Sequence, residues 1–284
     1  MILIFLHLVL ITACVSTVKS SDEVSKTDSF QMTFPDPDPV SDKLASRIPA
    51  PSGFVRVEEP TESFASFLNA LPLKSAGEPV RYYNDKVKSR RGVYCAVVDL
   101  PIGDRDLHQC ADAVMRLRAE YLWKHKRYDE IHFNTTSGFR LDYSKWMTGN
   151  RLSVKGNECS WVKRKKPSNS YLDFWSYMET VFSYAGTYSL SKELKPTNVS
   201  DLKIGDVFIQ GGFPGHAVIV VGKATHSATG QKIFLLAQSY MPAQELQILV
   251  NPNDPKLSPW YPLNFGERLV TPEWTFKKTD LKRF

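Results

Sequence analysis

Two short stretches, Gly205-Asp206-Val207-Phe208-Ile209 and Gly215-His216-Ala217-Val218-Ile219-Val220-Val221, decide the fold that the sequence predicts. Each opens with glycine and a polar residue and continues as an apolar run rich in β-branched residues, which is typical of a buried strand. A third apolar run, Ile233 to Ala237, follows the turn signal Ser227-Ala228-Thr229-Gly230, so we expect the last two strands to form a hairpin. These runs predict an antiparallel sheet in the C-terminal half.

Helical patterns precede these strands. The segment Asp106 to Lys126 repeats apolar residues, Cys110 among them, at helical spacing, and its charged residues Arg116, Arg118 and Glu120 are expected to face solvent. A second helix is expected over residues 170–185, with Ser170 as its cap and Gly186 at its end. A strand over Gly92 to Leu100 completes an N-terminal α+β extension. The predicted class is therefore α+β.

The order of helix, linker, Gly205-Asp206 strand and Gly215-His216 strand resembles the catalytic core of NlpC/P60 cell-wall peptidases, which are papain-like enzymes. That family carries Asp-Cys-Ser-Gly at a helix start and Ala-Gly near its end. Here Asp173 lies in the first turn of the second helix, and Ala185-Gly186 close it. The resemblance covers about residues 170–240 and implies a papain-like core within a single globular domain over residues 53–284.

The nucleophile is where this sequence departs from that family. Phe174 stands where the family has its cysteine, Trp175 follows it, and neither ring can attack a carbonyl carbon. Cys95, Cys110 and Cys159 do not match the position, and Cys95 and Cys110 are interpreted as core residues. The resemblance therefore implies the scaffold and its groove without the peptidase activity.

His216 is the principal candidate for a catalytic role, as a general base. The alternative interpretation is a structural histidine without a catalytic role. The resemblance gives Gln238 the role of orienting His216. A hydroxyl nucleophile at Ser176 is less favoured, because this residue lies about half a helical turn from Phe174. The candidate ligand-binding residues are Phe174, Trp175, His216, Gln238, Ser239, Arg140 and Trp146.

Other chemistries have weaker support in the sequence. A glycosidase-like pair could use Asp142 with Glu120 or Glu130, although surface acids are the simpler interpretation. His125, Glu130 and His132 have no standard metal-ligand spacing, so we expect neither a metal nor another cofactor. The net charge of +6 is diffuse, its one dense run being residues 163–166, and this argues against a nucleic-acid partner.

The first residues predict an exported lipoprotein. Residues 2–13 are almost wholly apolar but too short to span a membrane, which fits a signal peptide over residues 1–13. Ile11-Thr12-Ala13-Cys14 resembles a bacterial lipobox, with Cys14 as the lipidated residue. Residues 14–52 are rich in polar residues and proline and are expected to form a flexible tether. The expected location is the bacterial cell envelope, with the protein anchored to the membrane and facing the periplasm or the exterior.

The whole chain also resembles an uncharacterised family of bacterial envelope proteins, a domain of unknown function. The segments that carry this resemblance are Gln109–Met115, Ser137–Arg140, Tyr184–Thr187 and Gln238–Pro242. We therefore expect an envelope lipoprotein that binds a cell-wall peptide or glycan, with peptidoglycan as its partner, in a papain-like groove without a nucleophile. The alternative is a cell-wall hydrolase that uses carboxylates, or His216 with a hydroxyl. A third possibility is a structural partner for another envelope protein.

Overall fold

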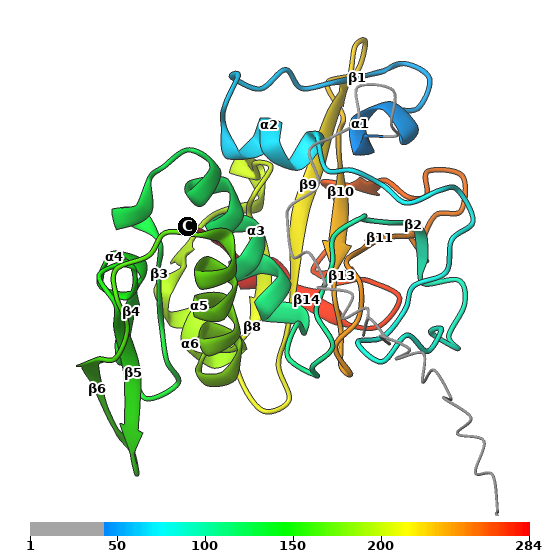
Figure 1. Ribbon diagram of the computed structural model, residues 1–284. Coiled ribbons are helices and arrows are strands. Elements are labelled where there is room, and N and C mark those ends of the chain that lie inside the picture. The colour runs from blue at the N-terminus through cyan, green and yellow to red at the C-terminus, as the bar shows by residue number, and fades with distance from the viewer. Residues whose placement is uncertain (1–42) are drawn as a thin grey trace, which may run out of the picture. The chain divides into compact units, whose positions relative to one another are not determined.

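The computed structural model describes residues 43–284, and a nine-stranded antiparallel sheet lies at the centre of this part of the chain (Figure 1). Its strands, in spatial order, are β2 (Tyr94–Val97), β11 (Gln247–Leu249), β10 (Lys232–Gln238), β9 (His216–His226), β8 (Val207–Gln210), β15 (Leu281–Arg283) and β7 (Lys195–Pro196). In addition, β1 (Phe54–Arg56) pairs with β9, and β12 (Tyr261–Pro262) pairs with β10. The predictions of an α+β class and an antiparallel sheet are confirmed.

Helices and small sheets surround this centre. The helices are α1 (Leu44–Arg47), α2 (Phe64–Asn69), α3 (Cys110–Lys124), α4 (Tyr143–Met147), α5 (Tyr171–Tyr184) and α6 (Thr187–Glu193), with 3-10 turns at Tyr128–Glu130, Val199–Asp201 and Lys278–Asp280. Three hairpins pair β3 (His132–Asn134) with β4 (Arg140–Asp142), β5 (Asn150–Lys155) with β6 (Glu158–Lys163), and β13 (Arg268–Val270) with β14 (Thr275–Lys277).

Both faces of strand β9 are buried. Ala217, Ile219 and Val221 join the core that contains α3 and α5, whereas Val218 and Val220 join a second core with β13 and β14. Figure 1 shows α3, α5 and α6 on one side of the sheet. Because side chains alternate between the two faces of a strand, a strand covered on both sides reads as a continuous apolar run, which is why the sequence predicts it so clearly.

Helix α3 is more deeply buried than its sequence suggests. Arg116 and Glu120, expected to face solvent, are 1% and 2% exposed, so that prediction is wrong for these two residues. The guanidinium of Arg116 lies 3.3 Å from the Glu120 carboxylate and stacks on the Trp175 ring at 4.5 Å. Tyr171 of α5 also donates a hydrogen bond of 2.5 Å to Glu120. These side chains are buried because α5 covers the outer face of α3.

The folded body begins earlier than the sequence predicts. Residues 43–52, assigned to the tether, include helix α1, whose Leu44 is fully buried, and Ile48 is 8% exposed. The backbone amide of Leu44 donates to the Leu71 carbonyl oxygen at 2.9 Å, which ties α1 to the end of α2. The predicted signal peptide, Cys14 and the rest of the tether lie outside the described residues.

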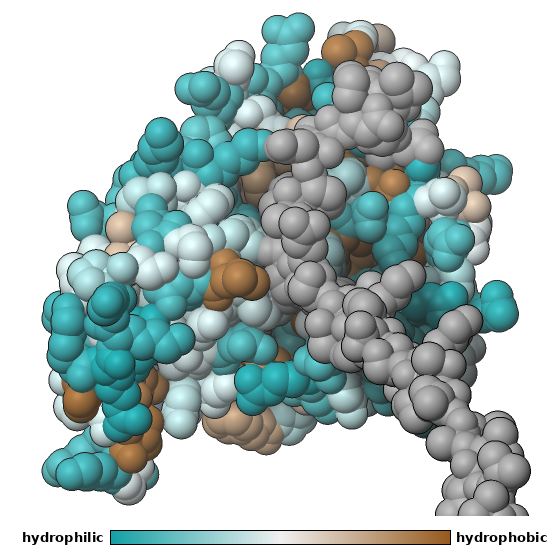
Figure 2. Space-filling model, in the orientation of Figure 1, coloured by the Kyte–Doolittle hydropathy of each residue, from teal (hydrophilic) through white to brown (hydrophobic). Residues whose placement is uncertain are grey.

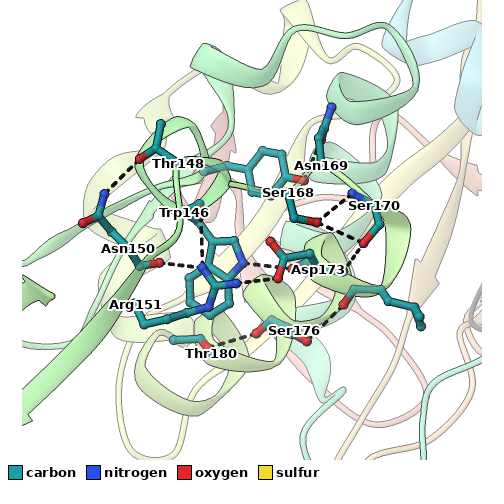
Figure 3. A network of polar contacts seen from close by, with 12 residues as sticks. Trp146, Thr148, Asn150, Arg151, Ser168, Asn169, Ser170, Asp173, Ser176 and Thr180 are labelled. Atoms are coloured by element: carbon teal, nitrogen blue, oxygen red, sulfur yellow. Dashed lines mark hydrogen bonds and ion pairs between the residues drawn. The ribbon is translucent and has the colours of Figure 1, made fainter. Parts of the chain in front are cut away.

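The β5–β6 hairpin is attached to the body through Arg151. Figure 3 shows Arg151 reaching from β5 to Asp173 on α5, with the Trp146 ring 3.9 Å from its guanidinium carbon. Trp146 also donates from Nε1 to the backbone oxygen of Asp173 at 3.0 Å. Figure 2 shows apolar surface on the hairpin. Of the hairpin residues, Val154 and Val162 are each 38% exposed. The Arg151–Asp173 ion pair is therefore one of the contacts that hold the base of the hairpin.

Candidate functional site

The first and last residues of two neighbouring strands form the centre of the candidate site. His216 opens β9, and Gln238 closes β10, which runs antiparallel beside it. Nε2 of His216 lies 2.8 Å from Oε1 of Gln238, and both side chains are 1% exposed. The structure therefore brings together the two residues that the sequence singled out as a catalytic pair.

A buried ion pair lies behind Gln238. Its Nε2 donates to Oε2 of Glu273 at 2.6 Å, and the same oxygen accepts from Nζ of Lys88 at 2.7 Å. The Lys88 and Glu273 side chains are 3% and 6% exposed. Arg90 lies on the outer side, 3.8 Å from Oε1 of Glu273. A chain of polar contacts therefore runs from His216 through Gln238 to a carboxylate that two cations stabilise.

Cys110 lies at the same place, at the first residue of helix α3. The backbone amides of Ala111, Ala217 and Cys110 itself lie close enough to its sulfur to favour the thiolate. Because Ala217 directly follows His216, this contact locates the thiol beside the start of β9. The thiol also interacts electrostatically with the Tyr240 hydroxyl, and the Tyr240 ring centre is 4.7 Å from that of His216. The start of α3, which carries Cys110, thus lies beside the start of β9, which carries His216, and the His216–Gln238 contact adds the end of β10.

Aromatic rings enclose the imidazole of His216. Besides Tyr240, the rings of Trp274 and Phe276 lie 5.4 and 5.9 Å from it, centre to centre. Burial lowers the pKa of His216 to about 4; the hydrogen bond with Gln238 opposes this shift, and the Lys88 charge adds to it. Burial, followed by the charge of Asp112, raises the pKa of the Cys110 thiol to about 11. At neutral pH the site therefore holds an uncharged thiol and an uncharged imidazole.

Phe174 and Trp175 do not take part in this arrangement. Phe174 packs in a buried aromatic cluster, with Trp123 and Tyr143 each 5.5 Å away between ring centres. Trp175 stacks under the Arg116 guanidinium. The helix that starts beside His216 is α3, and α5 lies outside it. The start of α5, which the resemblance matches to the nucleophile helix of the peptidases, therefore lies away from His216, and Asp173 holds Arg151.

The remaining candidate ligand-binding residues are held in other contacts. Ser239 is buried, and its hydroxyl lies 2.9 and 2.7 Å from the carbonyl oxygens of His108 and Gln244. Arg140 lies on β4, where it pairs with Asp142 at 2.6 Å. Trp146 packs at the base of the β5–β6 hairpin. Ser239 therefore lies at the border of the site through its chain position beside Gln238, whereas Arg140 and Trp146 belong to the region around α4 and the hairpin.

The alternative chemistries can be compared with the same structure. Glu120, Glu130 and Asp142 each pair with an arginine. The Ser176 hydroxyl donates to the backbone oxygen of Leu172 within α5. No cluster of three or more histidine, cysteine or acidic side chains in residues 43–284 is arranged to hold a metal ion. Over the same residues, no helix has the length and apolar character needed to cross a membrane.

Sequence reasoning missed Cys110, Lys88 and Glu273. It placed the helix start at Asp106, which put Cys110 inside the helix, whereas the structure starts α3 at Cys110 with Gln109 as its cap. One signal was present: Asp112 follows Gln109 by three residues, and its carboxylate accepts from the Gln109 amide at 3.0 Å, as in a capping box. Asp106, a more usual capping residue, instead accepts from the Ala243 amide at 2.6 Å.

Comparison with known proteins identifies a family but no activity. A family model described as Domain of unknown function (4846), DUF4846, matches residues 44–283. No curated protein and no solved structure gives a significant match. The matched region begins within helix α1 and ends in β15, so it coincides with the body that the structure describes. The chain therefore belongs to the DUF4846 family.

Proposed function

We propose that this protein is a thiol-dependent hydrolase of the papain type, with Cys110 as nucleophile, His216 as general base and Gln238 as the residue that orients His216. The observation that carries the proposal is that the start of α3, with Cys110, lies beside the hydrogen-bonded His216–Gln238 pair at the start of β9 and the end of β10. A nucleophile, a base beside it and a third group that orients the base are the parts that covalent acyl transfer requires.

The uncharged state of the pair sets the order of proton transfers. As the Cys110 sulfur attacks the carbonyl carbon of an amide, its proton passes to Nδ1 of His216, and a thioester forms when the amine leaves with that proton. Water then attacks the thioester while His216 accepts one of its protons. The acid departs, and the thiol recovers its proton from the imidazole. This cycle consumes one water and needs no other reactant.

Backbone amides at the start of α3 suit the negative charge that develops during this attack. The first amides of a helix have no acceptor within the helix, and the helix dipole favours negative charge at that end. The amides of Cys110 and Ala111 lie near the sulfur and favour its anion, so they suit an oxyanion formed on a carbon bonded to it. Such donors commonly contribute about 10²- to 10³-fold in rate.

We propose the cell wall as the substrate and the cell envelope as the location. Export and lipidation at Cys14, with attachment to the membrane, rest on the lipobox-like sequence Ile11-Thr12-Ala13-Cys14. The peptide part of peptidoglycan offers amide bonds for the chemistry above, and the net charge of +6 suits an acidic polymer. Under this proposal the papain-like interpretation holds, with α3 rather than α5 as the nucleophile helix.

The test uses residues 43–284 with purified peptidoglycan sacculi. Released fragments would be identified by mass spectrometry for the parent protein, Cys110→Ala and His216→Ala. Cys159→Ala is the matched control, because Cys159 is a half-buried free thiol on the β5–β6 hairpin. We expect peptide cleavage by the parent and by Cys159→Ala, and a loss of at least about 10²-fold for the other two variants.

The other results would favour different functions. Retention on sacculi without any fragment, equal for the parent and Cys110→Ala, would refute the hydrolase and support binding of a cell-wall peptide or glycan. Fragments that persist in Cys110→Ala but disappear in His216→Ala would assign the nucleophile to a hydroxyl or water. Glycan fragments released by all the variants would favour a carboxylate-based glycosidase.

A further inference from the structure

We propose that the buried Lys88–Glu273 pair fixes the proton of His216 on Nε2, so that Nδ1 is always the nitrogen free to accept the Cys110 proton. This inference rests on the proposed function for its catalytic meaning. The arrangement of protons follows from the contacts alone and can be tested separately. Lys88 and Glu273 are positioning residues here, because they act through Gln238.

The argument starts from what each group can donate or accept. A carboxylate only accepts hydrogen bonds, and Glu273 Oε2 lies 2.6 Å from Nε2 of Gln238. The Gln238 amide must therefore direct its NH₂ group at Glu273 and its carbonyl oxygen at His216. That oxygen also only accepts, so the His216 nitrogen 2.8 Å away has to carry the proton. In a neutral imidazole the other nitrogen, Nδ1, then holds a lone pair.

Lys88 fixes the position of the Glu273 carboxylate. Its ammonium lies 2.7 Å from the same carboxylate oxygen, and Arg90 adds a second cation 3.8 Å from the other oxygen. A group at this position that could donate as well as accept would allow the Gln238 amide to turn around and would reverse the proton arrangement. The lysine therefore keeps the direction of the whole chain of contacts constant.

The burial of this pair supports a role in positioning. Both side chains are nearly inaccessible, at 3% and 6%, and burying two charges costs desolvation that their attraction does not always offset. An apolar pair would fill the same space without that cost but could not orient an amide. Burial lowers the pKa of Lys88, whereas its contacts with Glu273 oppose that change. The pair is therefore better explained by the orientation it imposes on Gln238 than by stability.

The test is nuclear magnetic resonance of the imidazole nitrogens in the full chain, labelled with ¹⁵N at histidine, with His216→Asn used to assign the signal. In the parent we expect His216 to be neutral at pH 7 with its proton on Nε2. In Glu273→Gln, which keeps the shape but can also donate, we expect a mixture of both tautomers or a switch to Nδ1–H. Glu267→Gln, which removes a 91% exposed carboxylate, is the matched control and should leave the signal unchanged.

A second measurement connects the proton arrangement to reactivity. The rate of Cys110 alkylation by iodoacetamide, followed by peptide mass spectrometry, should fall in Glu273→Gln and in Lys88→Met in proportion to the fraction of His216 with its proton on Nδ1, by about 2-fold for an even mixture of tautomers and about 10-fold when nine-tenths have switched. A parent protein with its proton on Nδ1, or a Glu273→Gln variant with the parent's tautomer, would overturn the inference. If the tautomer changes as expected but Cys110→Ala still cleaves sacculi, the proposed function fails and the positioning role stands.

Discussion

The resting state of the Cys110–His216 pair is the most direct consequence of the site's burial. Burial, with a further contribution from Asp112, raises the pKa of the thiol to about 11, and burial lowers the pKa of His216 to about 4. At about pH 7.5, a thiol with a pKa near 11 is ionised to only about 3 parts in 10⁴, whereas an ordinary cysteine with a pKa near 8.5 is ionised to about one part in ten. We therefore expect about 300-fold less thiolate than at an unperturbed cysteine.

The assay is the ultraviolet absorbance of the thiolate during a pH titration, taken as the difference between the protein and Cys110→Ser. This difference removes the contributions of the other cysteines and does not depend on the access of a reagent. We expect no difference signal below about pH 9, and no change in that range when His216 is replaced by alanine.

One result would refute this reasoning. A thiolate signal at about pH 6 to 7 that disappears in His216→Ala would mean that the proton already resides on the imidazole before substrate arrives. In that case the amides of Cys110, Ala111 and Ala217 would stabilise the thiolate more strongly than burial opposes it. The proposed order of proton transfers, in which the thiol loses its proton during attack, would then be wrong.

Three further predictions concern stability. Burial raises the pKa of Asp112 to about 8, so the folded state keeps a proton that the unfolded state loses. In urea titrations the free energy of unfolding should therefore fall by about 2 kcal/mol from about pH 6.5 to 8. Asp112→Asn should remove this fall, and an unchanged fall in that variant would contradict the prediction. Arg151→Ala should lower the free energy of unfolding by about 3 kcal/mol or more in the same assay, because it leaves the buried Asp173 carboxylate without its cation. A decrease below about 1 kcal/mol would show that other contacts hold the hairpin. Gly215→Ala should lower the free energy of unfolding by about 1 to 3 kcal/mol and lower the melting temperature, because the new carbon would lie 2.3 Å from Oγ1 of Thr187 and 2.7 Å from the Gln210 carbonyl oxygen. Gly186→Ala is the control, because its new carbon would meet no atom within 4 Å. An equal effect of the two substitutions would contradict the steric argument.

The sheet could be predicted from the sequence because its central strands are marked locally. The expected strands 207–209, 217–221 and 233–237 all lie within β8, β9 and β10, and the turn at 227–230 joins the last two as an antiparallel pair. That pairing alone brings His216 and Gln238 to one end of the sheet. Residues at the ends of two strands of a hairpin are necessarily neighbours, so this half of the site required no tertiary information.

The position of Cys110 beside this pair could not be predicted in the same way, because it depends on which helix packs on the sheet. Both α3 and α5 are amphipathic, and α5 is nearer in sequence to β8, so chain order favoured α5. In the structure, α3 lies against β9 and α5 packs outside it over Arg116 and Glu120. Charged residues on a helix usually indicate a solvent-exposed face, and here they pair with each other beneath another helix.

Lys88 and Glu273 show why the remaining part of the site requires the structure. They are 185 residues apart, and each lies next to residues that suggest an ordinary surface loop. An ionised side chain is tolerated in the interior only when its partner is buried with it, so neither residue could be assigned to the core from its own neighbourhood. Their pairing places a carboxylate behind Gln238 and thereby gives direction to an amide that would otherwise accept either orientation. The hairpin makes histidine and glutamine neighbours, but the direction of the hydrogen bond between them depends on two charges from opposite ends of the described chain.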